Sequence, residues 1–142
     1  MERTILLVDD DNSVRYSVAR VLIGEGYRVI AAADGTQAIS VLQTESVDLV
    51  LLDLNLPVKN GWETFQQMTL KWPLIPIIII TARSNQLFQA LAAGAGALME
   101  KPLDFPKLLQ TASSLIAEPE NLRLARMAGK SAQFHYLPAH VG

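Results

Sequence analysis

Acidic, hydroxyl and basic side chains stand at the ends of four short apolar runs in this chain. The four junctions are Val8-Asp9-Asp10-Asp11, Leu52-Asp53, Ile80-Thr81 and Glu100-Lys101. Carboxylates, a hydroxyl and an ammonium group suit phosphoryl transfer, because that reaction depends mostly on positioning and charge neutralisation. These residues form a candidate site for that chemistry if the fold brings them together.

Three of the acids are expected to lie close to one another. If the apolar runs are parallel strands, their carboxyl ends share one edge of the sheet, where ligands bind. Asp9, Asp10 and Asp53 would then repel, since two unit charges ~4 Å apart cost ~4 kcal/mol at an effective dielectric of ~20. Either one carboxyl takes up a proton or a cation lies among them. A hard cation with oxygen ligands suits this set, and Mg²⁺ is the ordinary case.

The residue types suggest a role for each member of the site. With Mg²⁺ in place, Asp53 can act as a nucleophile, because carboxylates form acyl phosphates. Lys101 would hold one phosphoryl oxygen as a point charge, and Thr81 would hydrogen-bond another. Taken singly, these residues could be a strand-end acid, a solvated lysine and a turn hydroxyl, and Asp10 or Asp11 could simply cap a helix. Their joint placement at four strand ends favours the chemical interpretation.

Helical periodicity between the apolar runs predicts five β–α units. This pattern is typical of an α/β fold, a doubly wound five-stranded parallel sheet of the flavodoxin-like order 2-1-3-4-5 with helices on both faces. In that order strands one and three diverge at the ligand crevice, and here both end in aspartates. The expected strands are 5–8, 27–33, 49–52, 77–80 and 97–100, and the expected helices are 12–23, 34–46, 60–72, 85–93 and 105–116.

Composition limits the kind of protein this can be. The 142 residues are half hydrophobic, carry a net charge of −2 and include no cysteine. Disulfides and thiolate chemistry are excluded, and neither nucleic acid nor a membrane is expected as a direct partner. The longest apolar stretch is interrupted by Pro76 and is far shorter than the ~20 residues of a membrane span. The N-terminus leaves no room for a signal peptide, so a cytoplasmic location is expected.

The chain divides into a main domain at 3–117 and a C-terminal extension at 118–142. Residues 118–129 could form one more helix, and an irregular tail is expected from 131 onward. The extension is too short for a core of its own, and no output domain fits in it.

Four motifs closely resemble the receiver domain of two-component response regulators, the CheY-like domain. They are Val8-Asp9-Asp10-Asp11, the segment Asp-Leu-Asn-Leu-Pro-Val-Lys-Asn-Gly at 53–61, Thr81-Ala82 and Lys101-Pro102. The resemblance covers residues 3–117. It implies that Asp53 is the phosphoacceptor, with Thr81 and Lys101 assisting, and that the Lys101–Pro102 peptide bond is cis.

The resemblance also implies a ligand set for the metal. Asp10 and Asp53 would bind Mg²⁺ through their side chains, the backbone carbonyl of Asn55 would be a third protein ligand, and Asp9 would act through water. The phosphoryl donor would be a histidine kinase or a phosphotransfer protein. A downstream protein target would read the switched surface, and a homodimer is compatible with this. No enzymatic turnover is expected beyond the protein's own phosphorylation and dephosphorylation. The chain could be a stand-alone receiver or the first part of a longer regulator.

Two features depart from the family pattern. Leu98 stands three residues before the lysine, where many receivers carry Tyr or Phe that turns inward on activation. No charged residue occurs between Ser84 and Met99, although receivers commonly place charged pairs on this face.

Two other functions fit part of the pattern. In a small phosphohydrolase of the haloacid dehalogenase type, Asp9 would be the nucleophile, with Thr81 and Lys101 as later motifs, but Asp53 would be unexplained. An unphosphorylated interaction module on the same fold would usually lose the acids or the lysine, and this chain keeps them.

Overall fold

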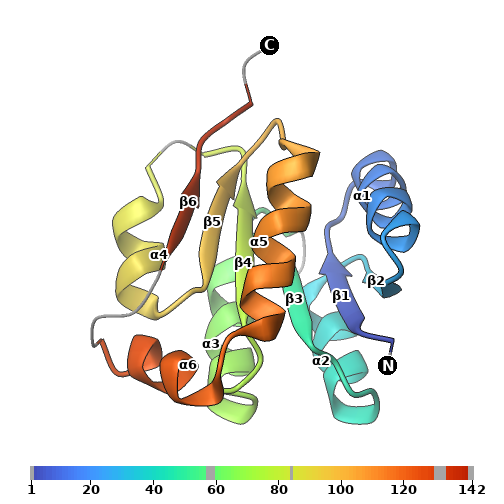
Figure 1. The fold of residues 1–142 in the computed structure, drawn as a ribbon. Helices are drawn as coiled ribbons and strands as arrows, with labels where there is room; N and C mark the ends of the chain where they lie inside the picture. Colours follow the sequence, from blue (N-terminus) through green and yellow to red (C-terminus); the bar gives the residue numbers. More distant parts are fainter. Residues whose placement is uncertain (1, 57–59, 84, 130–133, 141–142) are drawn as a thin grey trace.

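The computed structural model is an α/β sandwich built on one parallel sheet (Figure 1), and it describes residues 2–56, 60–83, 85–129 and 134–140. The strand order is β2-β1-β3-β4-β5-β6. The predicted order of the first five strands is confirmed. A sixth strand, also parallel, extends the sheet beyond β5.

The strands form where short runs of branched apolar residues can be buried on both faces. Every residue of β1, β3 and β4 is buried, whereas the edge strand β2 is partly exposed. Continuous burial explains why these runs are uniformly apolar rather than alternating. The strands are β1 Thr4–Val8, β2 Arg28–Ala32, β3 Leu49–Asp53, β4 Ile77–Thr81, β5 Ala97–Glu100 and β6 His135–Leu137.

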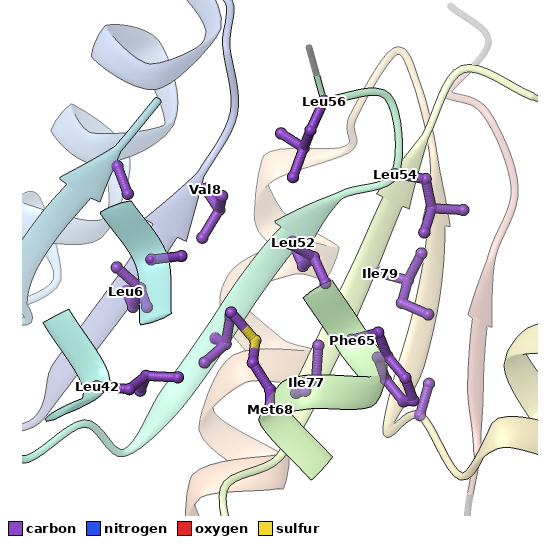
Figure 2. Close-up of a cluster of buried hydrophobic side chains, with 14 of the residues drawn as sticks. Leu6, Val8, Leu42, Leu52, Leu54, Leu56, Phe65, Met68, Ile77 and Ile79 are labelled. Carbon is purple, nitrogen blue, oxygen red and sulfur yellow. The ribbon is translucent and has the colours of Figure 1, made fainter. Parts of the chain in front are cut away.

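Helices cover both faces of the sheet. The helices are α1 Asn12–Gly24, α2 Gly35–Thr44, α3 Gly61–Lys71, α4 Leu87–Ala93, α5 Phe105–Ala117 and α6 Glu120–Met127. One core cluster joins the sheet to α2, α3 and α4, and a second joins the opposite face to α1 and α5. Figure 2 shows the first cluster, with Phe65 and Met68 of α3 packed over Leu52, Ile77 and Ile79. The two packed faces fix the strand ends in register, and so fix the residues that follow them.

Side-chain caps set where several helices begin. Asp11 accepts hydrogen bonds from the first turn of α1, and Asn60 accepts one from the backbone N–H of Glu63 in α3. Asn60 and Glu63 form a capping pair, since the Asn60 amide also donates to Glu63 Oε1 at 2.9 Å. Gly61 lets α3 begin against the β3 loop, because a Cβ there would lie 2.3 Å from the Cα of Leu54.

The C-terminal extension is more ordered than the sequence suggested. Helix α6 lies within 118–129, where a helix was expected, at the end of the sheet opposite the strand carboxyl ends (Figure 1). An irregular tail was expected after it, but residues 135–137 pair with β5 instead. A three-residue strand carries too little pattern to be recognised, and its conformation comes from the edge on which it lies. None of the helices in the described ranges has the length and apolar character that crossing a membrane requires.

Candidate functional site

Three carboxylates meet at the carboxyl end of the sheet. Strands β1 and β3 are neighbours, with Val8 opposite Leu52 in register, so Asp9 and Asp53 leave the sheet side by side. Asp9, Asp10 and Asp53 each offer an oxygen within 4.8 Å of the others. Asp9 and Asp53 are buried, and Asp10 is exposed to solvent. The predicted gathering of the acids is therefore present in the structure.

Backbone hydrogen bonds hold Asp9 in place. Its N–H donates to Ala32 O at 3.1 Å, and its Oδ1 accepts from the N–H of Asp11 at 3.0 Å. The Asp11 carboxylate in turn caps α1 by accepting from Ser13 and Val14. Asp11 is therefore the capping acid of this loop, and the carboxylate of Asp10 is left for the cluster.

Lys101 bridges the two buried acids. Its Nζ lies 3.2 Å from Asp9 Oδ2 and 3.1 Å from Asp53 Oδ2. Its backbone N–H donates to Thr81 O at 2.8 Å, and the Lys101–Pro102 peptide bond is cis. Three carboxylates and one ammonium leave an excess of two formal negative charges in this cluster.

The titration of the cluster reflects this crowding. Burial raises the pKa of the Asp53 carboxyl above its ordinary 3.8, and the charge of Asp9 raises it further. The hydrogen bond from the Asn55 N–H and the charge of Lys101 oppose that rise without cancelling it. Burial alone would lower the pKa of Lys101, but the charges of Asp53 and Asp9 hold it above its ordinary 10.5. The lysine is therefore charged at neutral pH, and the Asp53 carboxyl loses its proton less readily than that of a free aspartate.

Thr81 ends β4 at the same edge of the sheet. In register, Asp53 faces Ile80, so Thr81 lies one residue beyond the phosphoacceptor candidate. Its Oγ1 accepts from the N–H of Arg83 at 2.9 Å, which leaves the hydroxyl proton for another acceptor. Within the described part of the chain, no hydrogen bond joins Thr81 to the acids.

Asn55 reaches Asp53 through its backbone. Its N–H donates to Asp53 Oδ1 at 3.0 Å, so both oxygens of that carboxylate accept a hydrogen bond. The role of the Asn55 carbonyl as a metal ligand stays a prediction. Pro57, part of the motif after Asp53, lies outside the described residues.

Sequence reasoning missed one basic residue beside the cluster. The guanidinium of Arg15 donates to Asp9 O at 2.6 Å and also bonds the Asn12 side chain, which fixes the loop before α1. Its position one helical turn after Asp11 is the sequence signal that could have placed it near the acids.

An apolar groove opens beside Lys101. It has a volume of about 470 Å³ and lies between α1, which contributes Val14 and Val18, and the start of α5 with the loop before it, which contribute Phe105, Pro102 and Leu103. A partner helix that docked there would lie next to the lysine and the acids.

Comparison with known proteins identifies the family. The family model for the response regulator receiver domain matches residues 5–113. This chain belongs to the response regulator receiver family. The receiver is 40% identical over 115 residues to the transcriptional regulatory protein ZraR of Klebsiella oxytoca, a match that covers 80% of this chain and 26% of that protein. The chain spans between about a quarter and just over half of the length of the curated relatives it matches.

Solved receiver structures agree in fold. The CheY-like receiver protein of Methanospirillum hungatei JF-1 superposes with a TM-score of 0.78 at 29% identity, covering 82% of this receiver and 94% of that chain. The receiver domain of sensor histidine kinase PA1611 from Pseudomonas aeruginosa PAO1 superposes with a TM-score of 0.75 at 28% identity, covering 83% and 100%. That structure has a magnesium ion coordinated in its active site cleft.

The two departures from the family pattern have clear places in the structure. Leu98 is fully buried in β5 and stands opposite Tyr136 of the added strand. Helix α4, which has no charged residue, exposes Phe88 and Leu91, and 84% of the surface of Phe88 is accessible to solvent. The exposed side of α4 in this receiver therefore carries large apolar side chains, and the outer edge of β5 is paired with β6.

Proposed function

We propose that this receiver accepts a phosphoryl group on Asp53, with Mg²⁺, from a histidine kinase or phosphotransfer protein, and thereby switches a protein-interaction surface. The observation that carries this proposal is the Lys101 ammonium placed between two buried carboxylates at the shared edge of β1 and β3. A surface capping acid would be neither buried nor bridged in this way.

The donor set suits a hard divalent cation. Asp9, Asp10 and Asp53 supply oxygen atoms close enough to surround one ion, and exposed Asp10 leaves a side open to water. The excess of two negative charges equals the charge of one Mg²⁺, and Mg²⁺ usually keeps several waters. When bound, the ion would supply charge neutralisation and attraction for phosphoryl oxygens. The magnesium in the active site cleft of the PA1611 receiver domain supports this assignment.

The side chains of the site then assist the transfer of a phosphoryl group to Asp53. An oxygen of the Asp53 carboxylate forms a bond to phosphorus while the bond from phosphorus to the donor nitrogen breaks, and the donor imidazole keeps the electron pair. As the negative charge moves from the Asp53 carboxylate to the phosphoryl group, the Lys101 ammonium moves its contact to a phosphoryl oxygen. The Thr81 hydroxyl can donate a hydrogen bond to another phosphoryl oxygen. These contacts act by positioning and electrostatics, which is what phosphoryl transfer mainly requires.

Two surfaces beside the site can serve partners. The groove between α1 and the Pro102 loop is large and apolar enough to take a helix of the donor protein. The surface of α4, with Phe88 exposed, is available to a downstream protein. The relatives named as transcriptional regulators are much longer than this chain, which matches 26% of one and 45% of another.

Acetyl phosphate and intact-protein mass spectrometry test the proposal. The wild-type protein should gain the mass of one phosphoryl group with Mg²⁺ and not with EDTA, and Asp53→Asn should gain none. Asp34→Asn is the matched control, because the Asp34 carboxylate caps α2 by accepting from the Gln37 N–H and asparagine caps equally well. Labelling that survives Asp53→Asn but is lost in Asp9→Asn would favour the phosphohydrolase alternative. No adduct on the wild type, under conditions that label another receiver, would refute the proposal.

A further inference from the structure

The C-terminal extension reaches from the far end of the molecule to the candidate site. Helix α6 lies at the end of the sheet away from the acids, and β6 then runs beside β5 toward the carboxyl edge (Figure 1). The pairing begins where the N–H of His135 donates to Gly96 O at 3.2 Å. The segment 134–140, here called the C-terminal strap, is therefore part of the sheet that presents Lys101.

The strap contacts both chain neighbours of Lys101. The Tyr136 hydroxyl donates to Glu100 Oε1 at 2.9 Å, just before the lysine. The N–H of His140 donates to Pro102 O at 2.9 Å, just after it. The His140 ring adds a contact to Asp104, the N-cap of α5, with Nδ1 3.3 Å from Oδ2. One segment thus contacts the Glu100 side chain before the lysine and the Pro102 backbone after it.

The helix before the strap and the strap itself are each anchored away from the site. Arg126 of α6 forms a buried ion pair with Glu118, and Arg123 donates to the carbonyls of Leu74, Leu115 and Ile116. In the strap, Phe134, just before β6, and Leu137, the last residue of β6, pack against the two opposite core clusters. A segment anchored in this way can transmit a restraint, because its own position does not depend on the contacts it makes to the loop.

The strap restrains the loop that carries Lys101, and phosphoryl transfer depends on the position of this lysine. The Lys101 side chain has high rotamer freedom, so the direction of its ammonium depends on how well its backbone is fixed. Catalytic groups must be held within about 0.5 Å of the productive geometry, and shifts of about 1 Å cost large factors in rate. The hydrogen bond from the Lys101 N–H to Thr81 O positions the loop from the side of β4, and the strap contacts it from the other side of β5.

We infer that the C-terminal strap is a positioning element for Lys101, with Tyr136 holding the Glu100 side chain and His140 holding the Pro102 backbone, so that the lysine ammonium points at Asp53. This inference rests on the proposed phosphoryl transfer to Asp53. By linkage, a phosphoryl group that draws the lysine away from the carboxylates also changes how tightly the strap is held.

The first test removes a single hydroxyl. Tyr136→Phe keeps the ring on an exposed strand position and deletes the bond to Glu100, so the fold should survive. We expect labelling by acetyl phosphate to slow roughly three- to tenfold, which lies within the roughly two- to thirtyfold range of coupling between sites that are not in direct contact. The half-maximal Mg²⁺ concentration and the thermal midpoint should stay close to the wild-type values. Tyr27→Phe is the matched control, since Tyr27 precedes β2 at the other edge of the sheet, and it should label at the wild-type rate.

A cycle of variants shows whether the hydroxyl acts through Glu100. Glu100→Ala should slow labelling by a similar factor, and adding Tyr136→Phe to it should cause no further loss. Glu100→Gln keeps a carbonyl oxygen as acceptor and should restore most of the rate. Additive losses would mean that the two side chains act separately, which contradicts the inference.

Amide hydrogen exchange gives a readout that does not depend on labelling rate. Beryllofluoride with Mg²⁺ should change the protection of the amides of residues 135 and 140 in the wild type, and less in Tyr136→Phe. Wild-type labelling kinetics in Tyr136→Phe, together with unchanged exchange in the strap, would overturn the inference and leave the proposed function standing. A wild-type protein that never labels would instead refute the proposed function and the inference with it.

Discussion

The crowding of acids predicts that Asp53→Asn stabilises this receiver when no divalent cation is present. The substitution removes one buried negative charge, keeps the shape of the side chain, and leaves an oxygen to accept from the Asn55 N–H. Lys101 still pairs with Asp9, so no buried ammonium is left without a carboxylate. The usual penalty for breaking a buried pair, the orphaned partner, is therefore absent.

The distances give the size of the effect. At an effective dielectric of ~20, the Asp9 and Asp53 oxygens within 4.8 Å of each other repel by about 3.5 kcal/mol. At the same dielectric, the Lys101 ammonium at 3.1 Å attracts Asp53 by about 5 kcal/mol. The attraction exceeds this repulsion by about 2 kcal/mol. Repulsion from Asp10 through solvent offsets part of that difference, so the cost of burying the Asp53 charge decides the sign. We expect Asp53→Asn to raise the free energy of unfolding by about 1–2 kcal/mol at pH 7.

The pH dependence has a defined direction. Because the pKa of Asp53 is raised on folding, ionisation of Asp53 lowers the free energy of unfolding. This loss of stability develops as the pH rises from 3.8 through the pKa of Asp53 in the folded protein. The advantage of Asp53→Asn should therefore be largest near neutral pH and shrink as the pH is lowered. Urea unfolding of both proteins at pH 5 and pH 7.5, in EDTA, measures the difference, with Asp34→Asn as the control.

Magnesium should reverse or narrow the difference in free energy of unfolding between Asp53→Asn and the wild type. A ligand at 100 times its dissociation constant stabilises the protein that binds it by ~2.7 kcal/mol, and the variant lacks one of the three carboxylates. Two results would refute the reasoning: a variant less stable than the wild type by more than ~1 kcal/mol in EDTA, or a gap that grows on acidification.

Three further substitutions test other parts of the structure. Lys101→Met should lower the free energy of unfolding by about 3–5 kcal/mol in EDTA, because it leaves two buried carboxylates facing each other; urea unfolding measures this, and a loss below ~1 kcal/mol would contradict the importance of the bridge. Gly61→Ala should destabilise by about 3 kcal/mol or more, because its Cβ would lie 2.3 Å from the Cα of Leu54; a wild-type thermal midpoint would contradict this. Glu118→Ala should cost about 3 kcal/mol in chemical unfolding, because buried Arg126 loses its carboxylate, whereas Glu118→Gln, which keeps an acceptor, should cost less.

The core of the site was predictable because it depends on features that a sequence records directly. Ile77 to Ile80 and Leu49 to Leu52 are long enough, apolar enough and well enough separated by helices to define parallel strands. Parallel strands share a carboxyl edge, so the position of Asp53 beside Asp9 followed from the order of the strands. The capping of α3 by Asn60 was predictable for a similar reason, since it depends on residues three apart.

The features that the sequence did not predict depend on contacts between residues far apart in the chain. Whether Asp10 or Asp11 caps α1 is decided by the turn that Asp9 makes with the Asp11 N–H, and both acids have the right spacing. Strand β6 has three residues with no pattern of its own and forms because β5 offers an open edge. The contact from Tyr136 to Glu100 spans 36 residues and has no periodic signal. Such features arise from tertiary packing, which local propensity does not specify.

Strand β6 also bears on the colloidal behaviour of the protein. Without it, the outer side of β5 would present unpaired amide and carbonyl groups along Ala97–Glu100, and such an apolar strand is a template for pairing with other molecules. The added strand is only three residues long and includes a histidine and a half-exposed tyrosine, so it offers a much poorer template itself. Loosening the C-terminal segment would therefore favour self-association through the sheet, and aggregation on storage should follow detachment of β6 rather than global unfolding.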